Sequence, residues 1–213
     1  MSAPGPLVMG VTGASAQQLA VRALQLLLDA GQQVELVASR GCAQVWRDEQ
    51  GLVLPRSPDA QEAFWRRQCD RQGGQLRCHP WNALGAAIAS GSYPVRGMVI
   101  LPCTMGTVAR LAAGVSLELL ERAADVQLKE RRPLVIAPRE MPWTLIHLRN
   151  LTRLAEAGAH IAPPIPAWYQ RPESLNDMVD FLVIRILDSL GYDLGRQLRR
   201  WQGPVSLPVG SGA

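Results

Sequence analysis

The sequence predicts a single α/β domain built around a doubly wound parallel sheet. Four short apolar runs, which begin near residues 7, 34, 98 and 134, are each followed by a stretch of helical composition. This alternation of strand and helix is typical of a parallel sheet that carries helices on both faces. The length of 213 residues fits one such domain, because a chain of this size buries roughly 70% of its unfolded surface.

Composition and charge restrict the class of protein. The net charge is +4 and the arginines are scattered along the chain, which suits small anionic ligands better than a nucleic acid. The four cysteines form no C-x-x-C pair and the three histidines lie far apart, so neither a zinc site nor a disulfide framework is predicted. The chain shows no signal-peptide pattern and no apolar run near the ~18 residues that span a bilayer, and we expect a cytoplasmic protein.

The first strand and helix enclose a candidate anion site. The apolar run from Leu7 to Val11 predicts a buried strand, and leucines at helical spacing predict a helix that Gly31 closes. The turn between them has the sequence TGAS and supplies three small residues: Gly13, Ala14 and Ser15. Free backbone amides at the start of a helix bind phosphate where the helix dipole is positive. An ordinary turn between strand and helix explains the same residues, since the G-x-G-x-x-G spacing is absent.

The second strand and the irregular segment after it are less informative. Residues 34–38 predict another strand, and Ser39 and Arg40 follow at its carboxyl end. The Ser39 hydroxyl either holds the same phosphate or caps the next helix. Residues 51–97 contain many prolines and glycines, from which we expect loops and one short helix near residues 61–72.

A second unit of strand, polar turn and helix follows. Residues 98–101 predict a buried strand. The turn after it contains four residues of interest: Thr104, Met105, Gly106 and Thr107. The two threonines either cap the next helix or hold a ligand. Cys103 precedes this turn, and the role of a small buried hydrophobe suits it best, because no histidine is placed by sequence to activate a thiolate.

The helix predicted over residues 117–131 places two cations on one face. Arg122 and Lys129 are seven residues apart, or about two helical turns, and two such cations suit an anion. The alternative is a solvated helix in which each cation pairs with the carboxylate four residues earlier, Glu118 or Asp125. Lys129 is the only lysine in the chain. Because a compact ammonium and a guanidinium are not interchangeable, this lysine is a candidate for a specific function.

The densest group of ionisable residues surrounds the clearest buried strand. Residues 134–137 form an apolar run between two prolines, which predicts an interior strand of the parallel sheet. Arg139 and Glu140 lie just past its carboxyl end. Ligands of open α/β sheets bind at that edge, so a cation and a carboxylate there are candidates for a functional site.

The last third of the chain predicts two more helices joined by a proline-rich segment. Residues 146–157 have helical composition, and the proline-rich segment after them ends at Tyr169, as in a lid or a subunit contact. Ser174 and Asp177 form a capping box that opens a long amphipathic helix. Arg185 lies at the edge of the apolar stripe of that helix, where an arginine extends to solvent, pairs with an acid, or reaches an anion.

Several motifs together resemble the UbiX-type flavin prenyltransferases. They are TGAS at 12–15, PCT at 102–104, ERAADVQLKERRPLVIAPRE at 121–140, IHL at 146–148 and PPIPAWY ending at Tyr169. The likeness covers nearly the whole chain, from residue 7 to about residue 201, and the run from Arg122 to Glu140 is its most specific part. We expect a flavin prenyltransferase domain over residues 1–202 and a flexible tail over residues 203–213, which are rich in Gly, Pro and Ser.

The resemblance implies a flavodoxin-like fold that is usually assembled as a homo-oligomer, a dodecamer built from trimers. It implies an enzyme that needs no metal and joins the dimethylallyl group of dimethylallyl phosphate to N5 and C6 of reduced FMN. The product of such an enzyme, prenylated FMN, is passed to a UbiD-type decarboxylase. Whether the donor is the monophosphate or the diphosphate stays open.

The resemblance also implies roles for individual residues. FMN would be bound by one group: Gly13, Ala14, Ser15, Ser39, Thr104, Met105, Gly106, Thr107 and Arg139. The prenyl phosphate would be held by a second group, partly across subunits and near a late aromatic residue: Arg122, Lys129, Tyr169, Arg185 and Trp201. Glu140 would pass a proton between the flavin N5 and the leaving phosphate. The catalytic set is then Ser15, Arg122, Lys129 and Glu140. Three cations and a phenol around a poor leaving group would stabilise the charge that develops as its C–O bond breaks.

A few positions depart from the family pattern. Ala16 stands where glycine is usual, Leu19 replaces a usual aromatic residue, and Thr104 replaces a usual serine. These differences bear on how the flavin fits. They leave the predicted phosphate cluster intact.

Three other classes of protein share some of these features. The phosphopantothenoylcysteine decarboxylase type also binds FMN, but it lacks the RAADVQLKERR run. A short-chain dehydrogenase shares TGAS, but its Tyr-x-x-x-Lys pair is impossible here, because the only lysine is Lys129 and the residue four positions before it is Asp125. The non-enzyme alternative is a paralogue that stores or delivers flavin without prenylating it, as the departures at Ala16 and Leu19 would suggest. The presence of Glu140 and Lys129 argues against it.

Overall fold

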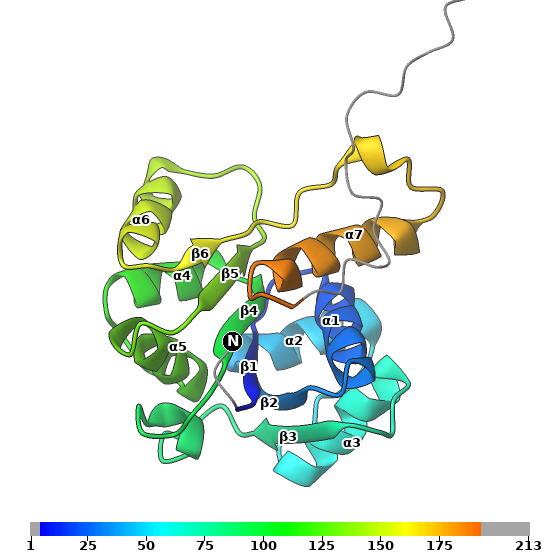
Figure 1. Ribbon diagram of the computed structural model, residues 1–213, viewed down its shortest axis with the longest axis horizontal. Helices are drawn as coiled ribbons and strands as arrows, with labels where there is room; N and C mark the ends of the chain where they lie inside the picture. Colours follow the sequence, from blue (N-terminus) through cyan, green and yellow to red (C-terminus); the bar gives the residue numbers. More distant parts are fainter. Residues whose placement is uncertain (1–4, 193–213) are drawn as a thin grey trace, which may run out of the picture.

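The fold is one parallel sheet between two layers of helices (Figure 1). The structure is a computed structural model that describes residues 5–192. Six parallel strands lie in the order β3-β2-β1-β4-β5-β6. They are β1 (Leu7–Val11), β2 (Gln33–Ala38), β3 (Gln75–His79), β4 (Gly97–Cys103), β5 (Leu134–Pro138) and β6 (His160–Ile161). The predicted single-domain, doubly wound and flavodoxin-like α/β fold is confirmed, whereas the predicted boundary at residue 202 and the tail over residues 203–213 lie outside the described residues.

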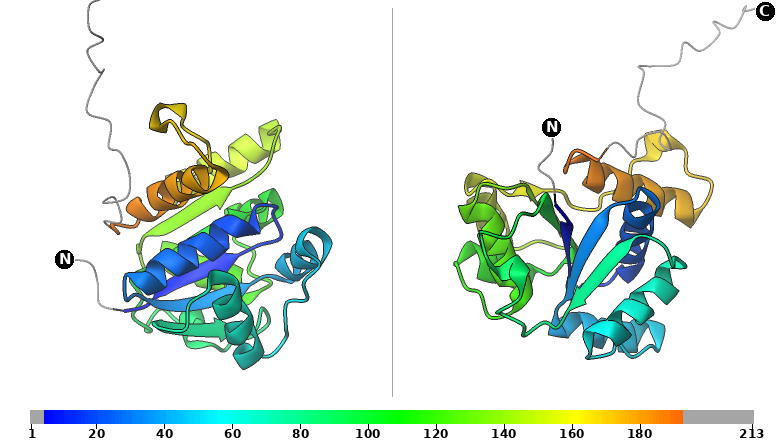
Figure 2. Two further views of the ribbon diagram at one scale, coloured as in Figure 1. Left: turned by 90° about the vertical axis from the view of Figure 1, so that its right-hand side faces the viewer. Right: turned by 60° about the horizontal axis from the view of Figure 1, so that its bottom comes forward.

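The helices divide between the two faces of the sheet (Figure 2). One face carries α1 (Gln17–Asp29), α2 (Arg40–Gln50), α3 (Pro58–Cys69) and α7 (Leu175–Asp188). The other carries α4 (Met105–Ala112), α5 (Leu119–Lys129) and α6 (Leu145–Glu156). Two short 3-10 helices, η1 (Ala87–Ala89) and η2 (Trp168–Gln170), lie in the loops. Within the described residues, no helix combines the length and apolar character that crossing a membrane requires.

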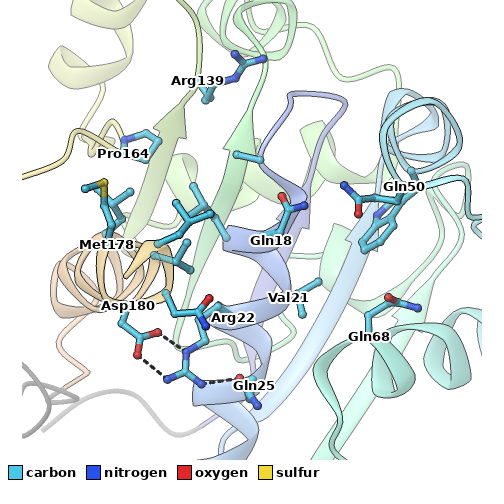
Figure 3. Close-up of a pocket in the computed structure, with 17 residues that line it drawn as sticks. Gln18, Val21, Arg22, Gln25, Gln50, Gln68, Arg139, Pro164, Met178 and Asp180 are labelled. Carbon is cyan, nitrogen blue, oxygen red and sulfur yellow. Dashed lines mark hydrogen bonds and ion pairs between the residues drawn. The ribbon is translucent and has the colours of Figure 1, made fainter. Parts of the chain in front are cut away.

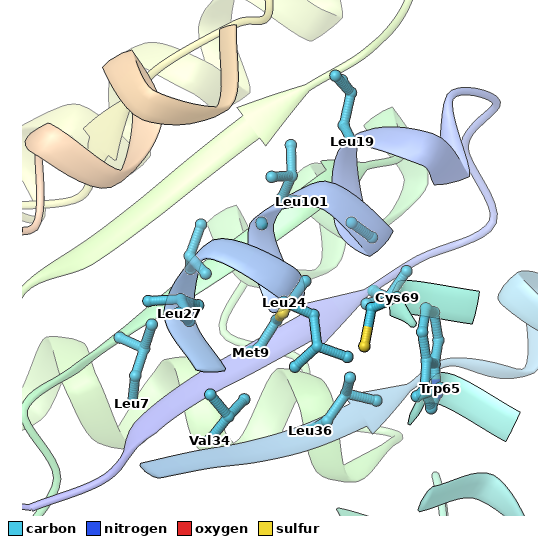
Figure 4. Close-up of a cluster of buried hydrophobic side chains, with 14 of the residues drawn as sticks. Leu7, Met9, Leu19, Leu24, Leu27, Val34, Leu36, Trp65, Cys69 and Leu101 are labelled. Atoms are coloured by element: carbon cyan, nitrogen blue, oxygen red, sulfur yellow. The ribbon is translucent and has the colours of Figure 1, made fainter. Parts of the chain in front are cut away.

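Alternate side chains of the central strand β1 point into two separate hydrophobic cores, one on each face of the sheet. Leu7 and Met9 of β1 pack with α1, α3 and α7, whereas Val8 packs with α4 and α5, because successive side chains of a strand point to opposite faces. The first core is shown in Figure 4, where Leu24 and Leu27 of α1 lie over the sheet. Both cores are buried, so the sheet is a rigid support for the loops at its ends.

The two edge strands were not predicted from the sequence. Loops were expected over residues 75–79, and this expectation was wrong, because β3 pairs there with β2. An edge strand is exposed on one side, and the alternating burial of β3 gives a weaker apolar signal than the fully buried β1. The helix expected near residues 61–72 is α3, which begins earlier because Ser57 is its N-cap and Pro58 its first residue.

The sheet order reverses between β1 and β4. β1 pairs with β2 on one side and with β4 on the other, and both pairings are parallel. The carboxyl ends of these three strands therefore share one edge, at the topological switch point where open α/β sheets bind ligands. The chain leaves them at Thr12, Ser39 and Thr104.

Candidate functional site

The Thr12 side chain joins the turns that follow β1 and β4. Its hydroxyl donates to the carbonyl oxygen of Pro102 (2.8 Å) and accepts from the backbone N–H of Thr104 (2.8 Å). Thr12 is only 1% exposed. The backbone N–H of Ser39 donates to the carbonyl of Val11 (2.9 Å), so all three turns are held at one edge. From the sequence, Thr12 was seen only as part of the TGAS motif.

The Gly13 turn is fixed by two neighbours. A Cβ atom at Gly13 would lie 2.6 Å from the backbone carbonyl of Gly41 in α2, so glycine is required here by a close approach of two backbones. The buried Gln17 amide donates to the carbonyls of Thr12 (2.9 Å) and Ala14 (2.8 Å). These contacts make the turn rigid, and sequence reasoning missed both Gly41 and Gln17, because neither belongs to a recognisable motif.

Ala16 has a left-handed backbone at the start of α1, with φ 78° and ψ 43°. This conformation suits glycine and is costly for a residue with a Cβ atom. The departure noted in the sequence therefore falls at a position where the backbone keeps the geometry of glycine although the residue is alanine.

A cavity of 490 Å³ opens beside the Thr12 and Gly13 turns. Four residues predicted to bind FMN line it: Gly13, Ser39, Thr104 and Thr107. Helices α2 and α4 both begin here, because the Ser39 hydroxyl accepts from Cys42 N–H (3.3 Å) and the Thr104 hydroxyl accepts from Thr107 N–H (3.1 Å). The capping roles considered for these two residues are confirmed. Two helix starts that point at one cavity are suited to an anion.

The cavity is also lined by two arginine–glutamate pairs that sequence reasoning did not assign to the site. Arg40 Nε donates to Glu118 Oε1 (2.9 Å). Arg110 Nε donates to Glu121, whose other oxygen accepts from the backbone N–H of Leu117 (2.7 Å). Both carboxylates are buried. The pairing of Glu118 with the cation four residues later, which belonged to the alternative of a solvated helix, is not formed, because Glu118 is the N-cap of α5 and its side chain bonds to Arg40 of α2.

A second, larger cavity of 820 Å³ lies on the other side of the same turn, between α1 and the start of α7 (Figure 3). Ala16, Leu19 and Arg139 line it together with apolar residues of α7 such as Met178. Two other lining residues bridge its helices, because Arg22 of α1 donates through Nη2 to Asp180 of α7 (2.9 Å). Five of the residues predicted to bind FMN therefore line these two cavities, four of them the smaller cavity and Arg139 the larger.

The remaining residues predicted to bind FMN also lie at this edge of the sheet, but they differ in their exposure to solvent. Ser15 and Gly106 are accessible, whereas Ala14 and Met105 are buried. The Met105 side chain packs in the core under α4 and is not accessible to a ligand. Cys103 is fully buried, and burial raises the pKa of its thiol, which fits the predicted role of a small buried hydrophobe.

The cations predicted to hold the prenyl phosphate are paired with nearby acids in the chain. Arg122 donates to Asp125 (2.6 Å) and to the carbonyl of Ala89 (3.2 Å). Lys129 donates to Glu130, which lies next to it. The i,i+4 pairing expected between Asp125 and Lys129 was wrong, because the Asp125 carboxylate faces Arg122 instead.

These cations do not meet Glu140 within one chain. Helix α5 begins at the cavity, where Leu119 N–H donates to the carbonyl of Trp81 (2.7 Å). It ends at Lys129, roughly 15 Å along the helix axis and close to Gly91. Arg185 is on α7, over the opposite face, and pairs with Asp188 (3.1 Å).

The other two predicted groups also lie apart. Glu140 is exposed past the end of β5 and accepts from the backbone N–H of Met141 (3.0 Å). Tyr169 is half exposed on η2, with its ring edge-to-face against Phe181 at a centroid distance of 5.9 Å. Trp201 lies outside the described residues. The predicted convergence of Lys129, Arg185 and Glu140 is thus absent from a single chain, and its form across subunits stays a prediction.

A parallel sheet with helix starts and hydroxyl groups at its switch point defines a protein that binds a phosphate-bearing cofactor. Comparison with known proteins identifies the class, since the model of the Flavoprotein family matches residues 2–187. The flavin prenyltransferase UbiX of Synechocystis sp. is 58% identical over 199 residues, which are 93% of this chain and 96% of that protein. The chain belongs to the Flavoprotein family and, within it, to the UbiX-type flavin prenyltransferases.

Solved structures agree with this assignment. AnUbiX (PadA1), in a crystal structure with FMN and dimethylallyl pyrophosphate, has a TM-score of 0.82 and 34% identity, and the match covers 94% of this chain and 99% of that one. A dodecameric FMN-dependent UbiX-like decarboxylase from Escherichia coli O157:H7 has a TM-score of 0.78 and 37% identity, with coverage of 93% and 100%. The predicted family and the predicted enzyme class are confirmed.

Proposed function

We propose that the chain transfers the dimethylallyl group of dimethylallyl phosphate, or of the diphosphate, to N5 and C6 of reduced FMN without a metal ion. The observation that carries this proposal is the gathering of Gly13, Ser39, Thr104 and Thr107 around one cavity at the sheet switch point. It is supported by AnUbiX, which has FMN and dimethylallyl pyrophosphate bound in its crystal structure. The prenylated FMN is then delivered to a UbiD-type decarboxylase. The cytoplasmic location expected from the sequence stays a prediction.

The residues at the edge of the sheet fit FMN. A phosphate group placed in the 490 Å³ cavity would meet the starts of α2 and α4 and the hydroxyls of Ser39 and Thr104. The turn of Gly13, Ala14 and Ser15 separates this cavity from the larger one, where Arg139 would lie near the flavin ring. When bound, reduced FMN supplies the nucleophilic N5 and C6 positions. The chain contributes binding, orientation and charge.

The prenyl phosphate site is assembled from several copies of the chain. Arg122, Lys129, Tyr169 and Arg185 would surround the phosphate, and Trp201 would lie near it. The first and the last of these cations occupy opposite faces of the sheet, so one chain cannot supply the whole group. A homo-oligomer, here proposed as a dodecamer, brings different copies of these residues together.

Exposed apolar side chains support the proposed assembly. They lie around the carboxyl edge, on the segment before α6, on α6 itself, near η2 and at the start of α7: Met141, Leu145, Ile146, Ile165, Trp168 and Leu175. Met141 is 87% and Leu175 77% exposed in the single chain. A group of large exposed apolar residues is typical of a protein–protein interface. The UbiX-like relative from Escherichia coli O157:H7 is dodecameric.

Glu140 is the proposed proton carrier. It is the second residue after β5, next to Arg139, which lines the larger cavity, and its side chain is exposed. A carboxylate there would take a proton from N5 and give it to the leaving phosphate, which is general acid–base catalysis. Ser15, which is partly accessible, belongs to the same predicted catalytic set.

The proposed function is tested by the mass of the flavin after reaction. Purified protein is incubated anaerobically with reduced FMN and either dimethylallyl phosphate or the diphosphate, and the flavin is extracted for mass spectrometry. We expect a flavin whose mass has grown by one prenyl unit with at least one donor. An unchanged flavin mass with FMN bound would favour the alternative, a paralogue that stores or delivers flavin.

Glu140→Gln tests the proton-transfer role. We expect FMN to stay bound and prenyl transfer in a single turnover to slow by about 10²- to 10⁴-fold, the usual contribution of a general acid or base. Glu156→Gln is the matched control, because it makes the same change at an exposed carboxylate at the end of α6. Single-turnover rates equal to wild type for Glu140→Gln would remove the residue from the mechanism.

A further inference from the structure

We propose that the Arg40 side chain donates hydrogen bonds to the phosphate of FMN and thereby makes the site selective for FMN over riboflavin. The proposal rests on the proposed function, because it takes the 490 Å³ cavity as the place of the FMN phosphate. It adds a specificity-determining residue that neither the sequence motifs nor the comparisons assign. Arg40 is the first residue of α2 and follows the Ser39 cap at the wall of this cavity.

The Arg40 guanidinium is held in place from two sides. Its Nε donates to Glu118 Oε1 (2.9 Å), and its backbone N–H donates to Glu118 Oε2 (3.3 Å). The guanidinium carbon lies 4.8 Å from the centroid of the Trp81 ring, a distance at which a cation is attracted to an aromatic face. Trp81 is itself tied to α5, because its carbonyl accepts from Leu119 N–H (2.7 Å). Both supports therefore belong to a fixed part of the fold.

This arrangement leaves the terminal nitrogens of Arg40 available. Of the three guanidinium nitrogens of Arg40, only Nε donates to Glu118. Neither Nη1 nor Nη2 donates a hydrogen bond to any other described residue. The side chain is 65% exposed although it lines the cavity. A guanidinium that is oriented through Nε and the ring face presents a planar pair of donors, which matches two oxygens of a phosphate group.

The other arginine of the cavity has a different role. Arg110 Nε is bound to Glu121, and its Nη2 donates to the hydroxyl of Thr107 (3.2 Å). That hydroxyl is 2.9 Å from the hydroxyl of Thr104. Arg110 thus orients the threonines of the α4 start, whereas Arg40 keeps its donors free for a ligand.

The charge balance of the cavity makes the short-range contacts of Arg40 important. The carboxylates of Glu118 and Glu121 offset the charges of Arg40 and Arg110, so the four side chains give no net charge to attract an anion from a distance. Affinity for a phosphate must then depend on direct hydrogen bonds and on the helix starts. Riboflavin, which has no phosphate, gains nothing from the Arg40 donors.

The test compares two flavins and three variants of the full chain. Dissociation constants for FMN and riboflavin are measured by fluorescence titration for wild type, Arg40→Gln, Arg40→Lys and Arg47→Gln. We expect Arg40→Gln to weaken FMN binding roughly 10- to 100-fold, the range for a hydrogen bond to a charged group, and to leave riboflavin binding unchanged. Arg40→Lys keeps the positive charge but lacks the planar pair of guanidinium donors. Its affinity for FMN should lie between those of wild type and Arg40→Gln. Arg47→Gln, on an exposed arginine two turns later in α2, should bind both flavins as wild type does.

Other outcomes overturn the proposal. An equal loss of affinity for both flavins in Arg40→Gln would show a structural role, and an unchanged FMN affinity would show no role in binding. Either result, together with prenylation of FMN by the wild type, would leave the proposed function intact. Loss of FMN selectivity in Arg40→Gln without any prenylation by the wild type would instead support the role of Arg40 and overturn the proposed function.

Discussion

Two parts of the proposed site are built in opposite ways. The flavin cradle, which we define as Thr12, Gly13, Ser39, Thr104 and Thr107, is joined by hydrogen bonds between turns that are far apart in sequence. The cation arms, which we define as Arg122, Lys129 and Arg185, are each paired with an acid within three residues in the chain. The cradle is therefore complete within one chain, whereas the arms have only local partners there.

Losing the interactions of the cradle costs more free energy than losing those of the arms. A buried hydrogen bond such as those of Thr12 is costly to lose, because it leaves unpaired polar groups inside the protein. A solvent-exposed ion pair contributes only about 0–1 kcal/mol, and Lys129 and Arg185 are both exposed. The arms can therefore exchange their present partners for a phosphate at little cost, and the cradle keeps its shape throughout.

The largest effect on the rate of prenyl transfer is expected when Lys129 and Arg185 are substituted, each in a separate variant of the chain. Lys129→Ala and Arg185→Ala should each slow prenyl transfer by about 10²-fold or more, because each removes a cation from the charge that develops on the leaving group. When the two variants are co-expressed and assemble randomly, sites that take the two residues from different copies should recover roughly a quarter of the wild-type rate. The rate is measured from the prenylated flavin formed per active chain.

This experiment separates assembly between chains from assembly within one chain. The control is co-expression of two differently tagged copies of Lys129→Ala, which should show no recovery. If the mixed oligomer of the two variants also failed to recover, each site would take both residues from the same copy, and the contrast between a complete cradle and dispersed arms would be wrong.

A smaller effect is expected in the cradle. Thr12→Val keeps the shape of the side chain but leaves the N–H of Thr104 without its partner and removes one of the two hydrogen bonds that the Pro102 carbonyl accepts, the other coming from the Thr12 backbone N–H (3.2 Å). We expect a loss of about 1–3 kcal/mol in the free energy of unfolding, measured by urea denaturation, and weaker FMN binding. Thr152→Val is the matched control, since the Thr152 hydroxyl is exposed and bonds only to Leu148 in its own helix. Equal stability of the two variants would contradict a special role for Thr12.

The same contrast explains what the sequence could predict. Four of the five cradle residues were predicted, because they belong to the turns that follow buried apolar strands, and strand ends of a parallel sheet meet at one edge. The roles of Thr12 and Gly41 were missed because they depend on contacts between distant turns. The placement of the arms could not be predicted in one chain, because helical spacing shows that Arg122 and Lys129 share a face but does not show what that face contacts.

The ion pairs of helix α5 show a further limit to what residue spacing can predict. Spacing allowed Glu118 to pair with Arg122 along its own helix, which was one of two alternatives, but the residue lies at the N-cap and bonds to Arg40 from another element. An i,i+4 rule applies only when both residues are inside the helix. Whether a residue is the cap or the first residue of a helix is the feature that sequence patterns fix least well.

The smallest effect is expected at the turn between the two cavities. Ala16 has a left-handed backbone with φ 78°, which costs a residue with a Cβ atom roughly 1–2 kcal/mol. Ala16→Gly removes this cost but adds about 0.5–1 kcal/mol of conformational entropy to the unfolded state, so the variant should be more stable than wild type by up to about 1.5 kcal/mol in thermal or urea denaturation. Ala157→Gly is the control, because the φ of Ala157 is −74° and only the entropy loss applies there. If Ala16→Gly were the less stable variant, the Ala16 methyl group would contribute packing against the core that outweighs its strained backbone, and the cradle would depend on this side chain as well as on its hydrogen bonds.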